Sequence, residues 1–404
     1  MEEKLNALKT ILAEVADLSR ANAALEWDQQ VNMPPRGSES RAEIMATLKR
    51  LQHVRFTSEE VGLLLEELHP LSSQLPADSD DACLIKVISR IYQRETKVPT
   101  EWVEQFERTR ALAFRIWAEA RAEKNFNKFR PYLEKIVDMT REYAEFFAPY
   151  DHVYDPLLDR FEPGMKTADV QKIFAPLRIE QVALIKAISE KPQVEDRFLY
   201  QPYDERAQWD FSVKLISDIG FPWERSRLDR AVHPFTITLG HHDVRITTRV
   251  EPEFISSNLF SVLHEGGHAL YDLGFSDSLD RTLLDDGASL GIHESQSRMW
   301  ENLVGRSLPF WRRYYPELQR VFPAQLGNVG LEAFYKGINK VEPSLIRVEA
   351  DEATYNLHVM LRLELEIGLM ERSIAVKDLP EAWNERMQAY LGILPPDDSK
   401  GVLQ

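Results

Sequence analysis

Cysteine, glycine and long apolar runs are the features that this 404-residue sequence has least of. Its one cysteine, Cys83, excludes an internal disulfide bond and a zinc site built from cysteines alone, and it is typical of a reducing compartment. No window approaches 18 uninterrupted apolar residues, and the N-terminus lacks the basic start and apolar stretch of a signal peptide. We therefore expect a cytoplasmic protein without a membrane-spanning helix.

Basic residues are also in deficit. Lys and Arg number 49 against 65 Asp and Glu, which gives a net charge of −16, and there is no run of five basic residues. A surface this acidic repels nucleic acid and anionic membranes, because both carry negative charge. The charge balance therefore predicts no nucleic-acid partner and no membrane partner.

Glycine numbers only 17, and long glycine-free stretches rich in Ala, Leu, Glu, Lys and Arg favour helices. Helical patterns start near Thr57 and Pro99, and others cover residues 3–27, 126–147, 167–190, 204–218, 256–273, 291–307, 330–340, 345–372 and 378–391. One region differs, because β-branched residues alternate at 236–239 and 244–250 around a polar link and predict a hairpin. The sequence thus predicts a mainly α fold with one small sheet.

The segment His264-Glu265-Gly266-Gly267-His268 has the form His-Glu-x-x-His within the predicted helix 256–273. His264 and His268 are four residues apart and share one helical face, and two imidazoles at this spacing bind one zinc ion. Glu265, on the adjoining edge, is placed to take a proton from the attacking water and pass it to the leaving amine. The motif predicts a zinc-dependent hydrolase; the alternative is a helix with two solvated or capped histidines.

A catalytic zinc ion needs a third protein ligand, and no Gly-x-x-His follows the motif as it does in metzincins. A carboxylate from the predicted helix 291–307 is the alternative: Glu294 is our candidate, and Glu301 is its rival. A first-turn glutamate that favours the helix dipole is the other interpretation of Glu294. The neighbouring His293 either contacts a tetrahedral intermediate or is a packed histidine, and both interpretations stay open.

No Gly/Ser linker, low-complexity tract or internal repeat divides the chain. Pro156, Pro163 and Gly164 mark a break, which we interpret as a loop because the composition does not shift across it. We expect one large domain over residues 1–404, with an N-terminal helical part (1–160) and a part that carries the metal site (161–404).

Taken together, these residues resemble the M32 family of metallocarboxypeptidases, the thermostable carboxypeptidase Taq type. The resemblance extends to the N-terminal region through Trp27-Asp28-Gln29 and Met33-Pro34. Five ordered signatures carry it: His233-Pro234-Phe235, Asp243-Val244-Arg245-Ile246-Thr247, the His-Glu-x-x-His motif, His293-Glu294-Ser295-Gln296 and Ile346-Arg347-Val348-Glu349-Ala350-Asp351.

The resemblance implies a gluzincin-like helical fold with a deep groove and a small sheet near the metal site. It implies removal of single C-terminal residues from peptides with a free C-terminus, by a homodimer that uses zinc, with cobalt as the alternative metal. His264, His268 and Glu294 would bind this metal, and Glu265 would be the general base.

The same resemblance implies a set of substrate contacts. Arg347 would hold the terminal carboxylate of the substrate, a task suited to a forked guanidinium. The alternative for Arg347 is an ion pair with Asp351, four residues later. Further substrate contacts would come from His293, His233 and Arg245.

The last residues, Gly401-Val402-Leu403-Gln404, look like the family's Gly-x-x-Gln signature, which leads into a further C-terminal segment in the family. We expect this chain to lack that segment, which closes part of the groove and supplies a tyrosine near the reaction. Two alternatives to a carboxypeptidase therefore stay open. One is a zinc endopeptidase or oligopeptidase with the same metal core, and the other is a catalytically silent protein that retains the metal and binds peptides.

Overall fold

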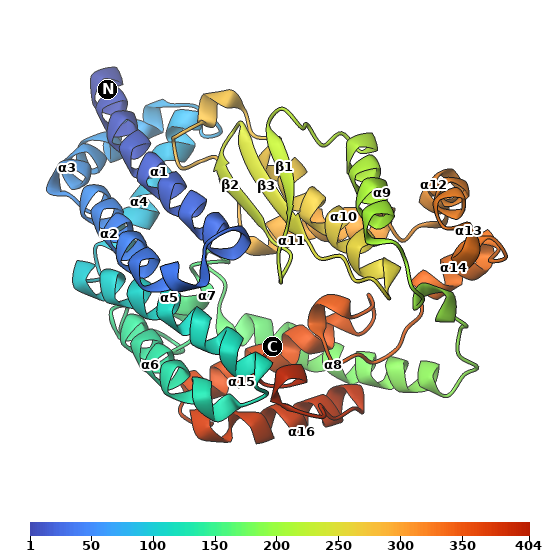
Figure 1. The fold of residues 1–404 in the computed structure, drawn as a ribbon. Helices are drawn as coiled ribbons and strands as arrows, with labels where there is room; N and C mark the ends of the chain where they lie inside the picture. Colours follow the sequence, from blue (N-terminus) through green and yellow to red (C-terminus); the bar gives the residue numbers. More distant parts are fainter. The chain divides into compact units, whose positions relative to one another are not determined.

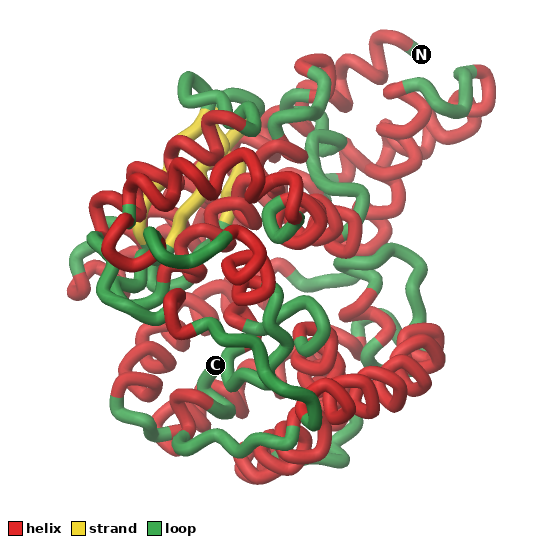
Figure 2. The backbone as a smooth tube through the Cα atoms, turned by 90° about the vertical axis from the view of Figure 1, so that its right-hand side faces the viewer, coloured by secondary structure: helices red, strands yellow, loops and turns green.

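The computed structural model describes residues 1–404, and most of them lie in helices. Sixteen α-helices and one three-stranded sheet make up the regular structure (Figure 1). In the tube view of Figure 2 the strands gather in one place, and helices account for most of the remaining chain. The prediction of a mainly α fold with one small sheet is confirmed.

The chain divides into two compact units. Unit 1 comprises residues 1–112, 219–248 and 265–288, and unit 2 comprises residues 113–218, 249–264 and 289–404. Two helices, α5 (Thr100–Ala122) and α10 (Ile255–Asp272), contribute residues to both units. None of the helices is long and apolar enough to span a bilayer. The expectation of one domain, with parts 1–160 and 161–404, stays a prediction.

Unit 1 is built on four complete helices: α1 (Glu2–Val31), α2 (Ser38–Phe56), α3 (Glu59–Leu68) and α4 (Asp80–Glu95). Helix α1 buries Leu5, Leu8 and Leu12 at three-to-four spacing, so one helical stripe faces a shared apolar core. Phe56 and Ile88 of α2 and α4 belong to the same core. Burial of this stripe is the driving force that holds the four helices together.

The sheet also belongs to unit 1 and has the strand order β1 (Ser226–Arg230), β3 (Asp243–Thr248), β2 (Thr236–Gly240). β2 and β3 form the predicted antiparallel hairpin, and α1 lies beside β2 (Figure 1). Gly240 closes the hairpin at a φ of +154°, a conformation that side chains disfavour. Strand β1 pairs with β3 in parallel and lies outside the predicted hairpin, since only one of its residues, Leu228, is apolar.

Unit 2 contains ten complete helices, and its main core lies around the last long ones, where Met360, Leu361, Trp383 and Met387 are buried. The helices are α6 (Phe126–Glu145), α7 (Asp155–Leu158), α8 (Thr167–Ser189), α9 (Glu205–Asp218), α11 (Leu290–Arg298), α12 (Leu308–Val321), α13 (Pro323–Leu326), α14 (Leu331–Ile338), α15 (Tyr355–Met370) and α16 (Leu379–Leu391). Helices α2, α4, α7, α12 and α13 lie outside the predicted ranges. In α12, Pro309 and Pro316 obscure the helical pattern.

Two predicted helices differ from the structure near the candidate site. The predicted helix 345–372 begins only at Tyr355, because the Asp351 side chain accepts hydrogen bonds from the backbone N–H groups of Ala353 and Thr354 at 2.9 and 3.1 Å. The predicted helix 291–307 is α-helical only to Arg298, and residues Met299–Val304 form a π-helix. Single π-turns of this kind are frequent at functional sites.

Candidate active site

Helix α10 carries the His-Glu-x-x-His motif. His264 and His268 are half-buried and lie one turn apart, while Glu265 between them is 6% exposed. Gly266 and Gly267, the two central residues of the motif, are buried. The predicted spacing of the two imidazoles along one helical face is therefore present in the structure.

Glu294 reaches the motif from a second helix, α11. This helix begins after Ser289, whose hydroxyl accepts a hydrogen bond from the backbone N–H of Ile292 at 3.2 Å. Glu294 Oε2 lies 3.6 Å from His264 Nε2. His264, His268 and Glu294 each offer one ligand atom, and these atoms lie within 4.8 Å of one another. The structure thus brings together the three residues that the sequence analysis put forward as metal ligands.

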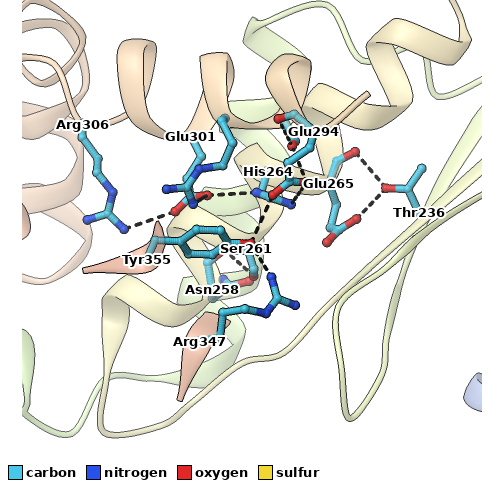
Figure 3. Close-up of polar contacts among 12 residues, drawn as sticks. Thr236, Asn258, Ser261, His264, Glu265, Glu294, Glu301, Arg306, Arg347 and Tyr355 are labelled. Carbon is cyan, nitrogen blue, oxygen red and sulfur yellow. Dashed lines mark hydrogen bonds and ion pairs between the residues drawn. The ribbon is translucent and has the colours of Figure 1, made fainter. Parts of the chain in front are cut away.

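Glu301, the rival ligand, lies on the other side of the His264 ring. Its carboxylate accepts a hydrogen bond from His264 Nδ1 at 2.9 Å, so the ring turns Nε2 toward Glu294 (Figure 3). Burial by itself would raise the pKa of Glu301, but the hydrogen bond from His264 and the charges of Arg306 and Arg298 lower it to about 2. Glu301 is therefore an anion that orients this imidazole, as carboxylates do beside metal-binding histidines.

Glu265 is held by the sheet of unit 1. The hydroxyl of Thr236, the first residue of β2, lies 2.6 Å from Glu265 Oε2 and 3.1 Å from the Glu265 carbonyl oxygen (Figure 3). An ionised carboxylate only accepts hydrogen bonds, so the threonine is the donor. The contact limits the rotation of a carboxylate that would act as a general base.

Arg347 and Glu294 are joined through Tyr355, a residue that the sequence analysis did not single out. Arg347 Nη1 donates a hydrogen bond to the hydroxyl oxygen of Tyr355, and this hydroxyl lies 3.2 Å from Glu294 Oε1 (Figure 3). Burial raises the pKa of Tyr355, so its hydroxyl stays protonated. Asp351, the alternative partner of Arg347, accepts hydrogen bonds from the backbone N–H groups of Ala353 and Thr354 at the start of α15.

The other predicted substrate contacts lie in different surroundings. His233 is exposed in the segment between β1 and β2, and His293 is half-buried beside Glu294 on α11. Arg245 on β3 forms two hydrogen bonds with Asp243, at 2.8 and 2.6 Å, and stacks 4.5 Å from the ring centre of Trp27. Its guanidinium therefore already has a carboxylate partner.

Two histidines and a carboxylate that converge, with a glutamate inside the helical motif, define the class of helical metallopeptidases. The similarity of this chain to known proteins supports the same class. The model of the carboxypeptidase Taq (M32) metallopeptidase family matches residues 7–404. The chain therefore belongs to the M32 family of metallocarboxypeptidases, and it is a hydrolase that acts on peptides.

Individual relatives support the same assignment. Thermostable carboxypeptidase 1 of Thermus thermophilus is 42% identical over 403 residues, which cover 97% of this chain and 78% of the relative. Carboxypeptidase 1 of Bacillus subtilis is 35% identical over 395 residues, which cover 98% and 78%. The crystal structure of the M32 carboxypeptidase from Deinococcus radiodurans R1 has a TM-score of 0.89 at 37% identity, and the match covers 100% of this chain and 81% of that one.

Proposed function

We propose that this chain is a zinc-dependent carboxypeptidase that removes single C-terminal residues from peptides. The observation that carries the proposal is a continuous set of contacts within unit 2. It runs from His264 to Glu294, from Glu294 to Tyr355, and from Tyr355 to Arg347. This set connects a candidate metal ligand to a guanidinium suited to a terminal carboxylate.

His264, His268 and Glu294 would hold the metal ion. Two imidazoles and one carboxylate are a donor set that suits zinc, and they leave a position open for substrate and water. Cobalt suits the same nitrogen and oxygen donors. When bound, Zn²⁺ supplies Lewis-acid chemistry to the scissile carbonyl and to the attacking water. The orientation of His264 by Glu301 supports this assignment, because a ring whose Nδ1 is bonded to Glu301 presents Nε2 to the ligand cluster.

Glu265 would move the proton. Its carboxylate accepts a proton from the attacking water and returns it to the leaving amine, as a general base and then a general acid. Thr236 holds Glu265 Oε2 at 2.6 Å, which keeps the carboxylate in one orientation during both transfers. Burial of Glu265, which is 6% exposed, limits competition from bulk water.

Arg347 would bind the C-terminal carboxylate of the peptide. Among its five N–H donors, one from Nη1 is directed at Tyr355, and the remaining fork can take a carboxylate in bidentate fashion. His233, His293 and Arg245 remain proposed substrate contacts. The family resemblance also supports a homodimer, and the single cysteine supports a cytoplasmic location.

The test compares hydrolysis of an N-blocked dipeptide with hydrolysis of its C-terminal amide. Zinc-loaded wild type should release the last residue from the free acid only, and Glu265→Gln should abolish release while zinc still binds stoichiometrically. Glu332→Gln, on an exposed residue of α14, is the matched control and should keep full activity. Cleavage of both substrates would establish an endopeptidase instead, and zinc binding without any cleavage would establish a catalytically silent protein.

A further inference from the structure

We propose that Tyr355 is a positioning residue that makes Glu294 bind the metal through one carboxylate oxygen only, and that the same hydroxyl aligns Arg347. This inference rests on the proposed function, since it assigns a task to a residue that joins the metal ligand to the carboxylate-binding arginine. All residues that carry it belong to unit 2.

The direction of the hydrogen bonds follows from the chemistry of the three groups. Arg347 has only donors, so it must donate to the phenol oxygen of Tyr355. The ionised Glu294 has only acceptors, so the single phenol proton must point to Glu294 Oε1, 3.2 Å away. A donor to the phenol oxygen polarises its O–H group and strengthens the next hydrogen bond. The arginine thus strengthens the hold of Tyr355 on Glu294.

The two carboxylate oxygens of Glu294 consequently have different surroundings. Oε1 accepts from Tyr355, while Oε2 lies 3.6 Å from His264 Nε2 and faces the ligand atoms of the cluster. Ser297 Oγ lies 3.1 Å from Oε2 and 2.7 Å from the Glu294 carbonyl oxygen, so its single proton is shared between these two acceptors. Oε2, which lies 3.6 Å from His264 Nε2, is therefore the oxygen that would meet a metal ion held by this histidine, and Tyr355 would keep Oε1 from becoming a second ligand atom.

The Tyr355 ring is fixed by the same charges that surround the metal ligands. The guanidinium of Arg298 lies 4.0 Å from the ring centre and that of Arg347 lies 5.4 Å from it. Arg298 also donates to Glu301 at 3.2 Å, and Glu301 orients His264. One arginine thus supports the partners of two metal ligands, which gives the tyrosine a defined position before substrate binds.

The experiment uses Tyr355→Phe, which removes the hydroxyl and keeps the ring that both arginines contact. Tyr315→Phe is the matched control, because its hydroxyl is also hydrogen-bonded, to the Val329 carbonyl at 2.8 Å, outside the set of site contacts. For each protein, zinc affinity is measured by chelator competition and the visible spectrum of the cobalt form is recorded. Steady-state KM is measured with the N-blocked dipeptide.

We expect Tyr355→Phe to weaken zinc binding about tenfold or more, the usual loss when a partner of a metal ligand is removed. Its cobalt absorption should weaken, since bidentate Glu294 raises the coordination number, and KM should rise. Arg347→Met should raise KM but leave the cobalt spectrum like that of wild type, because the phenol proton still points to Glu294. Tyr315→Phe should match wild type in all three measurements.

Wild-type zinc affinity and cobalt spectrum in Tyr355→Phe would overturn the inference while the proposed function stands. A wild type that binds no metal would overturn both. X-ray absorption of zinc-loaded wild type gives a test that does not need a folded variant. One oxygen from Glu294 in the first coordination shell supports the inference, and two oxygens from Glu294 overturn it.

Discussion

His264 Nδ1 donates a hydrogen bond to the carboxylate of Glu301, 2.9 Å away, although the two residues are 37 positions apart in the chain. Glu301 is in turn held by Arg298 at 3.2 Å and by Arg306 at 3.4 Å. The imidazole is therefore fixed from the side opposite the ligand cluster. This arrangement gives a buried acidic residue a task that its position in the sequence does not reveal.

Glu301→Gln should weaken zinc binding by about 10- to 100-fold, because the imidazole loses the anion that sets its orientation and tautomer. The same change leaves Arg306 buried without its counter-charge, so the free energy of unfolding should fall by about 3–5 kcal/mol. Chelator competition and chemical denaturation measure the two effects, with Glu332→Gln as the control. Zinc affinity equal to that of wild type would show that Glu301 only stabilises the fold.

Thr236→Val should lower kcat about 10- to 100-fold, because it removes a hydrogen bond to a charged group that is worth roughly 1.5–3 kcal/mol. Zinc affinity should stay unchanged, since Thr236 contacts the proposed base and none of the ligands. Thr236→Ser keeps the hydroxyl and should recover most of the activity. Equal loss in the valine and serine variants would mean that packing of the methyl group matters and the hydroxyl does not.

Stability of the metal-free protein should decrease on acidification because of His358, which is fully buried. Burial and the charges of Arg362 and Arg347 lower the pKa of His358 from 6.5 to about 3. The unfolded chain therefore binds this proton first as the pH falls, and the folded state loses roughly 1.4 kcal/mol per pH unit below about pH 6.5.

His358→Leu should remove this contribution and make stability less dependent on pH in that range. Denaturation of the metal-free protein at about pH 6.5 and about pH 5 should show a wild-type loss about 2 kcal/mol larger than the loss in the variant. His69→Leu, on an exposed histidine, is the control. Parallel pH dependence in wild type and His358→Leu would contradict the prediction.

Gly305→Ala should destabilise the protein by about 1–3 kcal/mol through overpacking. A Cβ at Gly305 would lie 2.6 Å from Leu263 Cδ1 and 2.8 Å from the carbonyl oxygens of Trp300 and Glu301, next to the π-helix. Because the strain would displace Glu301, zinc affinity should fall as well. Gly330→Ala, where an added Cβ meets nothing within 4 Å, should be near neutral in both measurements.

The candidate ligands on α10 could be predicted because their geometry is local. A separation of four residues places His264 and His268 on one face of any α-helix, whatever surrounds it. The sequence does not distinguish Glu294 from Glu301 as the third candidate ligand, because a separation of seven residues places both on similar faces of one helix. The contact of Glu294 with His264 Nε2, and of Glu301 with Nδ1, distinguishes the two, and both depend on the packing of α11 and the π-helix against α10.

Tyr355 and Thr236 could not be predicted in the same way. Tyr355 is 61 residues from Glu294 in the sequence, and Thr236 is 29 residues from Glu265. No local sequence pattern predicts a contact over such separations. The predicted helix 345–372 begins too early for a similar reason. The Asp351 side chain accepts hydrogen bonds from backbone N–H groups, and α15 begins only after them, at Tyr355. Side-chain hydrogen bonds to the backbone compete with a helix that the apolar pattern alone would continue.

The sequence by itself determined the helical class, the hairpin around Gly240, and the spacing of the metal motif, because periodicity and turn chemistry act over a few residues. Tertiary structure decided which glutamate joins the two histidines, which one orients His264, and how Arg347 connects to Glu294 through Tyr355. These choices depend on hydrogen bonds between distant segments, and such bonds exist only after burial of the apolar stripes has brought the segments together.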